Sequence, residues 1–336
     1  MKIVIVGSGG RLGAALAREY SHVASASQPM IVRKLGLGSP SHEFNVVGFN
    51  HSQLDLADSE QIHAKVDNLD FDVLINAGAL TNVDLCEKEP DLAFQINAES
   101  PRVLAEICAT KNVKLIHFST DYVFDGEKRE PYQEEDEAKP ISVYGESKRA
   151  GEENVLAIDN RHLVVRVSWV FGPDRPSFID AMIKRARESE HVDAVADKFS
   201  APTYTLDIAR MLPRFFYGKD AALQRQSGSY RPRTPQRGVP TETDADGGGI
   251  LHFANAGECS WQEYAQFGLD CCRSLGVPLK ARAVGALQLS QMKDWVARRP
   301  PYSVLSTEKF FSITGVTPRN WRDAAGDYIK KFYSPK

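Results

Sequence analysis

The chain opens with Ile3-Val4-Ile5-Val6-Gly7-Ser8-Gly9-Gly10-Arg11-Leu12-Gly13, an apolar run followed by a turn rich in glycine. A continuous β-branched run that ends at glycine is typical of a buried strand, and residues 14–20 have a helical composition. Strand, glycine turn and helix in this order are the context of a dinucleotide-binding fingerprint. The chain is therefore expected to begin as a parallel sheet with crossover helices.

Three glycines in this turn have the spacing GxxGxxG. Gly7 would permit the tight turn, Gly10 would let the backbone approach a pyrophosphate, and Gly13 would let helix and strand pack closely. The phosphates would lie at the helix N-terminus, where free N–H groups and the helix dipole favour anions. The alternative is a glycine-rich turn that binds no ligand.

Strand patterns recur along the first half of the chain, with helical patterns between them. Further strands are expected at residues 45–49, 71–75, 114–118, 163–169 and, later, 250–253. Helices are expected near residues 58–66, 90–110 and after Pro140. This regular alternation predicts an α/β fold, a Rossmann-type doubly wound parallel sheet.

Beyond Gly172 the alternation fades, although helical patterns return at residues 176–189, 207–216 and 261–275. We therefore expect a nucleotide-binding domain over residues 1–172, to which 200–217 and 250–256 return. Residues 173–336 would form a smaller C-terminal α/β substrate domain, with the tail 298–321 over the crevice.

Two segments are predicted insertions into this arrangement of strands and helices. Residues 21–44 extend the first crossover, and residues 218–249 contain many glycines and few large apolar side chains. Such a composition buries little surface, so residues 218–249 are predicted to be a mobile surface insertion.

Bulk composition excludes several classes of protein. The 336 residues are 42% hydrophobic and 25% charged, with a net charge of -3, which gives no indication of a nucleic-acid or membrane-surface partner. Five cysteines without a CxxC pair indicate reduced thiols, and no apolar run reaches membrane-spanning length. We expect a soluble cytoplasmic protein and predict no metal ligands.

The run Tyr144-Gly-Glu-Ser-Lys148 places a phenol and an amine four residues apart. On a helix these side chains share one face, and a nearby ammonium would lower the pKa of the phenol. A phenol tuned in this way exchanges a proton with a carbonyl or alcohol oxygen. The alternative is an exposed helix face on which the lysine reaches into solvent.

Polar and small residues follow several predicted strands, at the edge where open α/β sheets bind ligands. Thr120 follows the strand at 114–118 and would hydrogen-bond a reacting oxygen. Trp169 ends another strand as either a hydrophobic plug or a wall for a flat ligand group. Asn97 lies within the helix predicted at 90–110, and we expect its side chain to tie down a neighbouring strand end.

The second strand ends in Phe49-Asn50-His51-Ser52 without a carboxylate. An acidic residue there would bind the ribose 2′-OH of NAD, so its absence favours NADP, although no arginine stands beside it in sequence. Asp55 would accept a hydrogen bond from adenine, with Leu56 packed against the ring. The alternative for Asp55 is to cap the helix at 58–66, a role that Ser59 could also fill.

These motifs together resemble the extended short-chain dehydrogenase/reductase superfamily and, within it, the dTDP-4-dehydrorhamnose reductase family. The similarity covers nearly the whole chain. It depends on the glycine turn, Ser119–Gly126 (STDYVFDG), Tyr144-Gly-x-Ser-Lys148 with Gly151-Glu152, Arg166-x-Ser-Trp-Val-Phe-Gly172, Pro202-Thr203, Ser260-Trp261, Arg298-Arg299-Pro300, Ser303 and Leu305. The resemblance implies hydride transfer from NADPH, the preferred cofactor, or NADH to the 4-keto group of a dTDP-4-dehydro-6-deoxy-sugar. A homodimer is also expected.

The resemblance also implies roles for individual residues. Tyr144 would protonate the forming alkoxide, Lys148 would lower the Tyr144 pKa and hold the nicotinamide ribose, and Thr120 would tune the proton transfer. The sugar pocket would be lined by Thr120, Asp121, Trp169 and Val83. The cofactor would be held by Gly7, Gly10, Arg11, Leu12, Gly13, Asp55, Leu56, Gly78, Ala79, Thr81, Tyr144 and Lys148.

One departure from the family pattern lies in Ala196-Asp197-Lys198-Phe199-Ser200, where relatives favour glutamine and glycine in place of lysine and serine. Two other functions stay open at this point. One is a non-catalytic NADP-binding regulatory subunit of the kind that serves methionine adenosyltransferase. The other is an epimerase or dehydratase acting on another sugar nucleotide.

Overall fold

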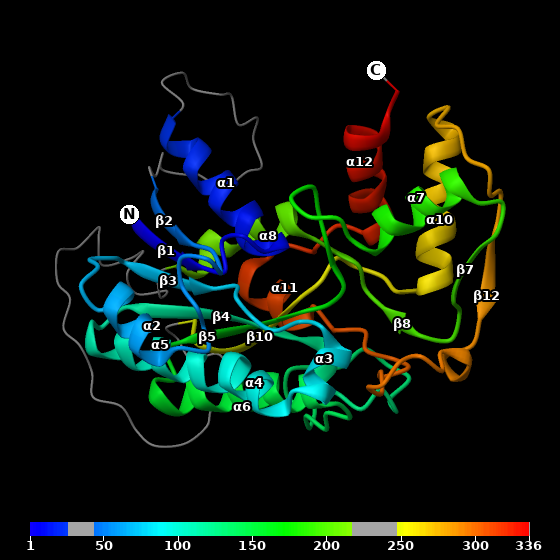
Figure 1. Cartoon of the computed structure of the whole chain (residues 1–336). Helices are drawn as coiled ribbons and strands as arrows, with labels where there is room; N and C mark the ends of the chain where they lie inside the picture. The colour runs from blue at the N-terminus through cyan, green and yellow to red at the C-terminus, as the bar shows by residue number, and fades with distance from the viewer. Residues whose placement is uncertain (26–43, 217–246, 336) are drawn as a thin grey trace.

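The computed structural model describes residues 1–25, 44–216 and 247–335, and in them a six-stranded sheet forms the centre of the larger part of the molecule (Figure 1). Every pairing in this sheet is parallel, in the order β10-β5-β4-β3-β1-β2. The strands are β1 (Lys2–Val6), β2 (Asn45–Phe49), β3 (Val73–Asn76), β4 (Lys114–Thr120), β5 (Leu163–Val167) and β10 (Gly249–Phe253). The chain steps from β1 outward to β2 and then back across β1 to β3, so the predicted doubly wound α/β sheet is confirmed.

Helices cover both faces of this sheet (Figure 1). One face carries α1 (Arg11–Ser25), α8 (Thr205–Met211) and α11 (Glu308–Thr314), and the other carries α2 (Ser59–Val66), α5 (Ser100–Thr110) and α6 (Val143–Ile158). Alternation along each strand divides the apolar side chains between the two layers: Ile3 and Ile5 face α1, whereas Val4 and Val6 face α2 and α5. Both faces are buried, which explains why the strands read as continuous apolar runs.

The helix predicted at 90–110 is interrupted. Its first turns are α4 (Pro90–Phe94), and a π-helical turn, η1 (Gln95–Glu99), follows before α5 begins. A Cβ at Gly151 of α6 would lie 2.1 Å from the Asn97 carbonyl oxygen, so only glycine lets α6 approach this turn. Short π-helical turns of this kind are common at functional sites. A further short helix, α3 (Val83–Lys88), follows β3.

The smaller part of the molecule lies beside the carboxyl ends of the strands (Figure 1). Its helices are α7 (Phe178–Glu188), α10 (Trp261–Ser274) and α12 (Trp321–Tyr333). Short strands pair around them: β7 (Val192–Val195) with β12 (Val284–Leu287), β8 (Phe199–Ser200) with β11 (Cys259–Ser260), and β6 (Val170–Phe171) with β9 (Thr203–Tyr204). Aromatic side chains dominate this core, where Tyr264 and Trp321 are fully buried.

Two segments return to the sheet from the second half of the chain. One includes the helix predicted at 207–216: α8 packs on α1 and continues as a 3-10 turn, η3 (Leu212–Phe215). The tail is divided, contrary to the expectation that it lies wholly over the crevice. Phe310 of α11 enters the core of the sheet, with its ring centre 5.0 Å from that of Phe253 in an edge-to-face arrangement.

Most of the two predicted insertions, at 21–44 and 218–249, lies outside the described residues, so the predicted mobility stays a prediction. None of the described helices combines the length and apolar character needed to cross a membrane.

Candidate active site

The glycine turn joins β1 to α1 beside the end of β3, at the point where the strand order reverses. Gly7 has a φ of +80°, and a Cβ there would lie 2.4 Å from the backbone nitrogen of Gly78. A Cβ at Gly13 would lie 2.2 Å from the Gly7 carbonyl oxygen. At Gly10 the same atom would meet only the Gly7 oxygen, at 3.3 Å, which leaves room beside the N-terminus of α1. This cradle fits a bound pyrophosphate.

The first helix after β2 is capped by Asp58, whose carboxylate accepts from Gln61 N at 2.9 Å. The alternatives considered for the cap were therefore wrong: Ser59 is the first helical residue, and Asp55 accepts instead from Ala57 N. Leu56 is buried, and its methyl group packs close to Gly78. Asp55 and Leu56 thus lie at the same crevice as the glycine turn.

The segment after β3 is clasped by Asn97. The Leu80 backbone donates to its side-chain oxygen at 2.8 Å and accepts from its side-chain nitrogen at 3.0 Å. The same nitrogen donates to Ser147 Oγ of α6. The expected role of Asn97 in tying down a strand end is confirmed. Neighbouring Ala79 is half-buried and Thr81 is exposed.

Tyr144 and Lys148 lie in the first turns of α6, which Ser142 caps by accepting from Gly145 N. Lys148 is fully buried and donates to the Phe118 carbonyl oxygen at 2.8 Å. Its Nζ also lies 3.2 Å from His117 Nε2. Burial lowers the pKa of Lys148 to about 8, against the opposing charge of Glu152. The same burial, with Lys148 beside it, depresses the pKa of His117 far enough to keep its ring neutral.

Tyr144 does not show the predicted fall in pKa. Burial raises the pKa of its hydroxyl, opposed by a hydrogen bond to the Thr120 side chain, and Lys148 is not among the groups that act on it. The amine is directed instead toward β4. A protonated phenol is nevertheless the form that donates a proton, which is the role the sequence predicts for Tyr144.

Thr120 ends β4 and makes two hydrogen bonds to the residues that follow it. Its hydroxyl donates to Asp121 Oδ1 at 3.1 Å, and its oxygen accepts from Tyr122 N at 3.2 Å. The Thr120 side chain also opposes the rise in the Tyr144 pKa, so the two side chains lie close to each other at the end of β4. Asp121 orients the Thr120 hydroxyl.

Asp121 is buried and collects donors from segments that are far apart in sequence. Its Oδ2 accepts from Ser303 Oγ at 2.6 Å and from Ser200 Oγ at 3.2 Å. Burial raises the pKa of Asp121, and Lys198 most strongly opposes that rise. Lys198 is itself buried, donates to the Pro300 carbonyl oxygen at 2.7 Å, and lies 4.9 Å from the centre of the Tyr122 ring. The sequence analysis assigns no role to Lys198, Ser200 or Ser303. Its signals are the departure from the family pattern at 196–200 and the place of Ser303 in the family resemblance.

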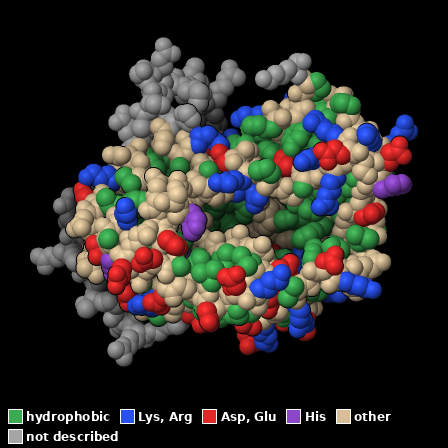
Figure 2. All heavy atoms as spheres, in the orientation of Figure 1, with side chains coloured by type: hydrophobic (Ala, Val, Ile, Leu, Met, Phe, Trp, Pro, Cys, Tyr) green, Lys and Arg blue, Asp and Glu red, His purple; other side chains and the backbone are tan. Residues whose placement is uncertain are grey.

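Trp169 lies just beyond β5, which ends at Val167 rather than at 169. Its φ of +44° is unusual for a bulky residue. The centre of its ring lies 5.3 Å from that of Trp261, on which it stacks, and 4.9 Å from that of Tyr264. Trp169 is half-buried, so it packs against these rings and part of its surface remains accessible. Val83 begins α3 and is half-buried. Figure 2 shows a hollow on this face of the molecule between the two parts, with hydrophobic side chains around it.

Arg11 and Leu12 are adjacent but face different surroundings. Leu12 is buried in the core beneath α1, whereas the Arg11 guanidinium donates to the carbonyl oxygens of Arg175 and Pro176. Both residues lie at the N-terminus of α1, beside the cradle left by Gly10. The contribution of residues 174–176 was not predicted from the sequence.

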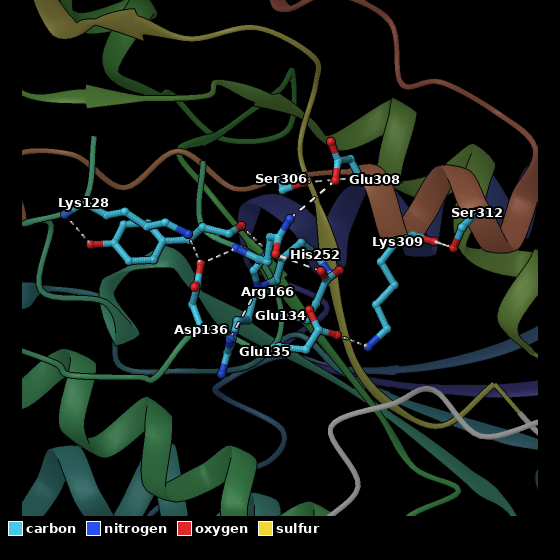
Figure 3. A network of polar contacts seen from close by, with 12 residues as sticks. Lys128, Glu134, Glu135, Asp136, Arg166, His252, Ser306, Glu308, Lys309 and Ser312 are labelled. Atoms are coloured by element: carbon cyan, nitrogen blue, oxygen red, sulfur yellow. Dashed lines mark hydrogen bonds and ion pairs between the residues drawn. The ribbon is translucent and has the colours of Figure 1, made fainter. Parts of the chain in front are cut away.

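A buried polar network supports α6 from behind (Figure 3). Arg166 of β5 makes two hydrogen bonds to Glu152 of α6, at 2.7 and 2.8 Å, and lies 3.4 Å from His252 Nε2. Glu134 accepts from the backbone nitrogen of His252 at 2.7 Å, and burial raises its pKa to about 7. The network holds the helix that carries Tyr144 and Lys148 against the sheet.

Comparison with known proteins extends these observations to the whole chain. The model of the RmlD substrate binding domain matches residues 1–231 and 236–334. The dTDP-4-dehydrorhamnose reductase of Mycolicibacterium smegmatis is 34% identical over 332 residues, which are 98% of this chain and 85% of that protein. The enzyme of the same name from Burkholderia thailandensis is 31% identical, covering 99% and 100% of the two chains.

A solved structure agrees with these sequence relatives. The crystal structure of dTDP-4-dehydrorhamnose reductase from Bacillus anthracis in complex with NADP superposes with a TM-score of 0.77. It is 27% identical and covers 98% of this chain and 99% of its own. The chain belongs to the dTDP-4-dehydrorhamnose reductase family.

Proposed function

We propose that the protein is an NAD(P)H-dependent oxidoreductase that reduces the 4-keto group of dTDP-4-dehydrorhamnose to give dTDP-L-rhamnose. The observation that carries this proposal is the position of the Tyr144 phenol, one helical turn before buried Lys148 and close enough to Thr120, at the carboxyl end of β4, for Thr120 to affect its pKa. Family membership supports the sugar nucleotide as substrate and polysaccharide biosynthesis as the wider process.

The residues would divide the reaction between them. Bound NADPH or NADH would supply the hydride for the keto carbon, and the ketone oxygen then needs one proton. Tyr144 would give that proton, because burial raises its pKa and keeps its hydroxyl protonated, with Thr120 nearby. Lys148 would hold the nicotinamide ribose and return a proton to Tyr144. Asp121 and Trp169 would contact the sugar, with Val83 beside them.

The cofactor cradle would be the turn from Gly7 to Gly13, with Asp55, Leu56 and Gly78 to Thr81 around the adenosine. The space beside Gly10 supports a bound pyrophosphate. NADPH is the preferred cofactor in this proposal, because Asn50, which follows the end of β2, is not a carboxylate, and NADH is the alternative. The NADP-bound relative from Bacillus anthracis supports the same preference.

The domain assignment is part of the proposal. Residues 1–172, with 200–217 and 250–256, would bind the cofactor, and residues 173–336 would complete the sugar-nucleotide site. A homodimer and a cytoplasmic location stay predictions from the sequence. A purely regulatory binding subunit is not favoured, because such a protein has no use for a proton donor aligned as Tyr144 is.

Replacement of Tyr144 by phenylalanine tests the proposal. We expect Tyr144→Phe to lower kcat by about two to four powers of ten, because the proton donor is lost while the ring remains. The measurement is oxidation of NADPH in the presence of dTDP-4-dehydrorhamnose. Tyr333→Phe, which removes a hydroxyl on α12, is the matched control and should retain activity. Full activity of Tyr144→Phe would remove the proposed acid.

A further inference from the structure

The glycine turn is covered by residues that follow it by more than 160 positions. In the segment between β6 and α7, Asp174 pairs with Arg18 of α1, and the carbonyl oxygens of Arg175 and Pro176 accept from Arg11. Arg175 in turn donates from Nε to the Gly9 carbonyl oxygen at 2.8 Å. Contacts in both directions thus fix this segment against the turn.

The Arg175 guanidinium is held by one edge only. Nε is bonded to Gly9, and among residues 1–25, 44–216 and 247–335 the two terminal nitrogens of Arg175 have no hydrogen-bond partner. A Cβ built on Gly9 would lie 3.8 Å from the Nη2 atom of Arg175 and 3.0 Å from the Cβ of Asn50. The free edge of the guanidinium and the end of β2 therefore flank the same point in space.

The end of β2 is where a Rossmann fold receives the ribose 2′ position of its dinucleotide. Asn50 brings no negative charge there, and its side-chain oxygen is occupied by the backbone nitrogens of Ser52 and Gln53. An arginine beside this position accommodates a 2′-phosphate. No arginine near Asn50 in sequence fills that role, and the fold supplies one from residue 175.

We propose that Arg175 binds the 2′-phosphate of NADPH and makes the protein prefer NADPH over NADH. This inference rests on the proposed function, since it concerns the cofactor of the same site. Nε fixes the guanidinium plane on the glycine turn, and the terminal nitrogens are left to make two charge-assisted hydrogen bonds to the phosphate. The pyrophosphate, which NADPH and NADH share, is the competing target for the same guanidinium.

The experiment compares both cofactors on the full-length protein without sugar. Dissociation constants for NADPH and NADH are measured by nicotinamide fluorescence for wild type, Arg175→Met and Arg175→Lys. Arg175→Met should weaken NADPH binding about 10- to 100-fold, the range expected for lost hydrogen bonds to a charged group. NADH binding should change less than about threefold, and Arg175→Lys should fall between wild type and Arg175→Met for NADPH, because it keeps the charge and loses the planar fork.

Arg185→Met, an exposed arginine on α7, is the matched control and should leave both constants unchanged. Equal weakening of NADPH and NADH would overturn the inference and assign Arg175 to the pyrophosphate. Unchanged NADPH binding in both Arg175 variants would also overturn it. Those outcomes leave the proposed function intact, whereas a wild-type protein that binds neither cofactor would refute the proposed function, and this inference with it. Arg175→Lys keeps the test valid if Arg175→Met is unstable.

Discussion

Two buried lysines, one in each part of the molecule, have the same pKa but different surroundings. Lys148 and Lys198 are both about 1% exposed, and burial lowers the pKa of each to about 8. Each donates to one backbone carbonyl oxygen, that of Phe118 at 2.8 Å and that of Pro300 at 2.7 Å. Lys148 otherwise meets the neutral ring of His117, whereas Lys198 faces aromatic rings and the Asp121 carboxylate.

The different surroundings of the two lysines suit a buried amine to two different roles. Around Lys148 the contacts are with neutral acceptors, so the amine gains or loses its proton with little rearrangement and suits a proton-transfer site. Lys198 and Asp121 instead stabilise each other's charge in a place where either charge alone would be costly. We therefore expect Lys198 to affect the proposed reaction through Asp121 and Thr120, as a positioning residue.

The largest expected effect is on catalysis. Lys148→Met should lower kcat/KM by about two to three powers of ten and weaken cofactor binding, because it removes a group next to the proton donor. Lys198→Met should leave cofactor binding within about threefold and lower kcat about tenfold, a loss of roughly 1.4 kcal/mol of transition-state stabilisation. Rates of NADPH oxidation give the kinetic constants of both variants, and cofactor titration gives their dissociation constants. Equal losses in both variants would show that the two lysines do not differ in function.

The placement of Lys148 near Tyr144 and Thr120 could largely be predicted from the sequence, because it depends on residues that are close together in the chain or directly follow a strand. Tyr144 and Lys148 are one helical turn apart, and Thr120 follows directly from a strand pattern. The alternation of strands and helices likewise sufficed to predict the doubly wound sheet. The predicted lowering of the Tyr144 pKa by Lys148 was wrong, because the amine is directed toward Phe118 and burial of the phenol dominates.

The contacts around Lys198 and Asp121 could not be predicted from the sequence, because they join segments that are far apart along the chain. Asp121 meets Ser200 across 79 positions and Ser303 across 182, and no local spacing encodes such a meeting. Arg175 reaches Gly9 across 166 positions in the same way. The left-handed backbone at Trp169 also has no signal in its residue type, since bulky side chains disfavour that conformation.

A double-mutant cycle sharpens the comparison through stability. Asp121→Asn leaves Lys198 buried without a counter-charge and should lower the free energy of unfolding by about 3 kcal/mol at pH 7. Lys198→Met in addition should recover about 1–3 kcal/mol of that loss, because the two charges are coupled. Urea unfolding of the wild type, both single variants and the double variant measures this coupling. Strict additivity would mean that Lys198 does not serve as the counter-charge of Asp121.

A further expected effect, on stability and not on catalysis, is a slope of the free energy of unfolding with pH to which both lysines contribute. The folded pKa of each lysine, about 8, lies below the ordinary value of 10.5, so between these pH values the unfolded chain binds more protons than the folded one. The free energy of unfolding should therefore rise with pH across this window, by up to about 1.4 kcal/mol per pH unit for each lysine, and should gain nothing from them below pH 8. Buried cysteines such as Cys108, whose pKa is raised by burial, oppose this trend, so the informative quantity is the difference between each variant and the wild type.

Lys148→Met and Lys198→Met should each remove about the same share of the slope, and Lys65→Met, at an exposed position of α2, is the control. If only Lys198→Met changed the slope, Lys148 would titrate at its ordinary value, and the site would lack the readily deprotonated amine on which the contrast between the two lysines depends.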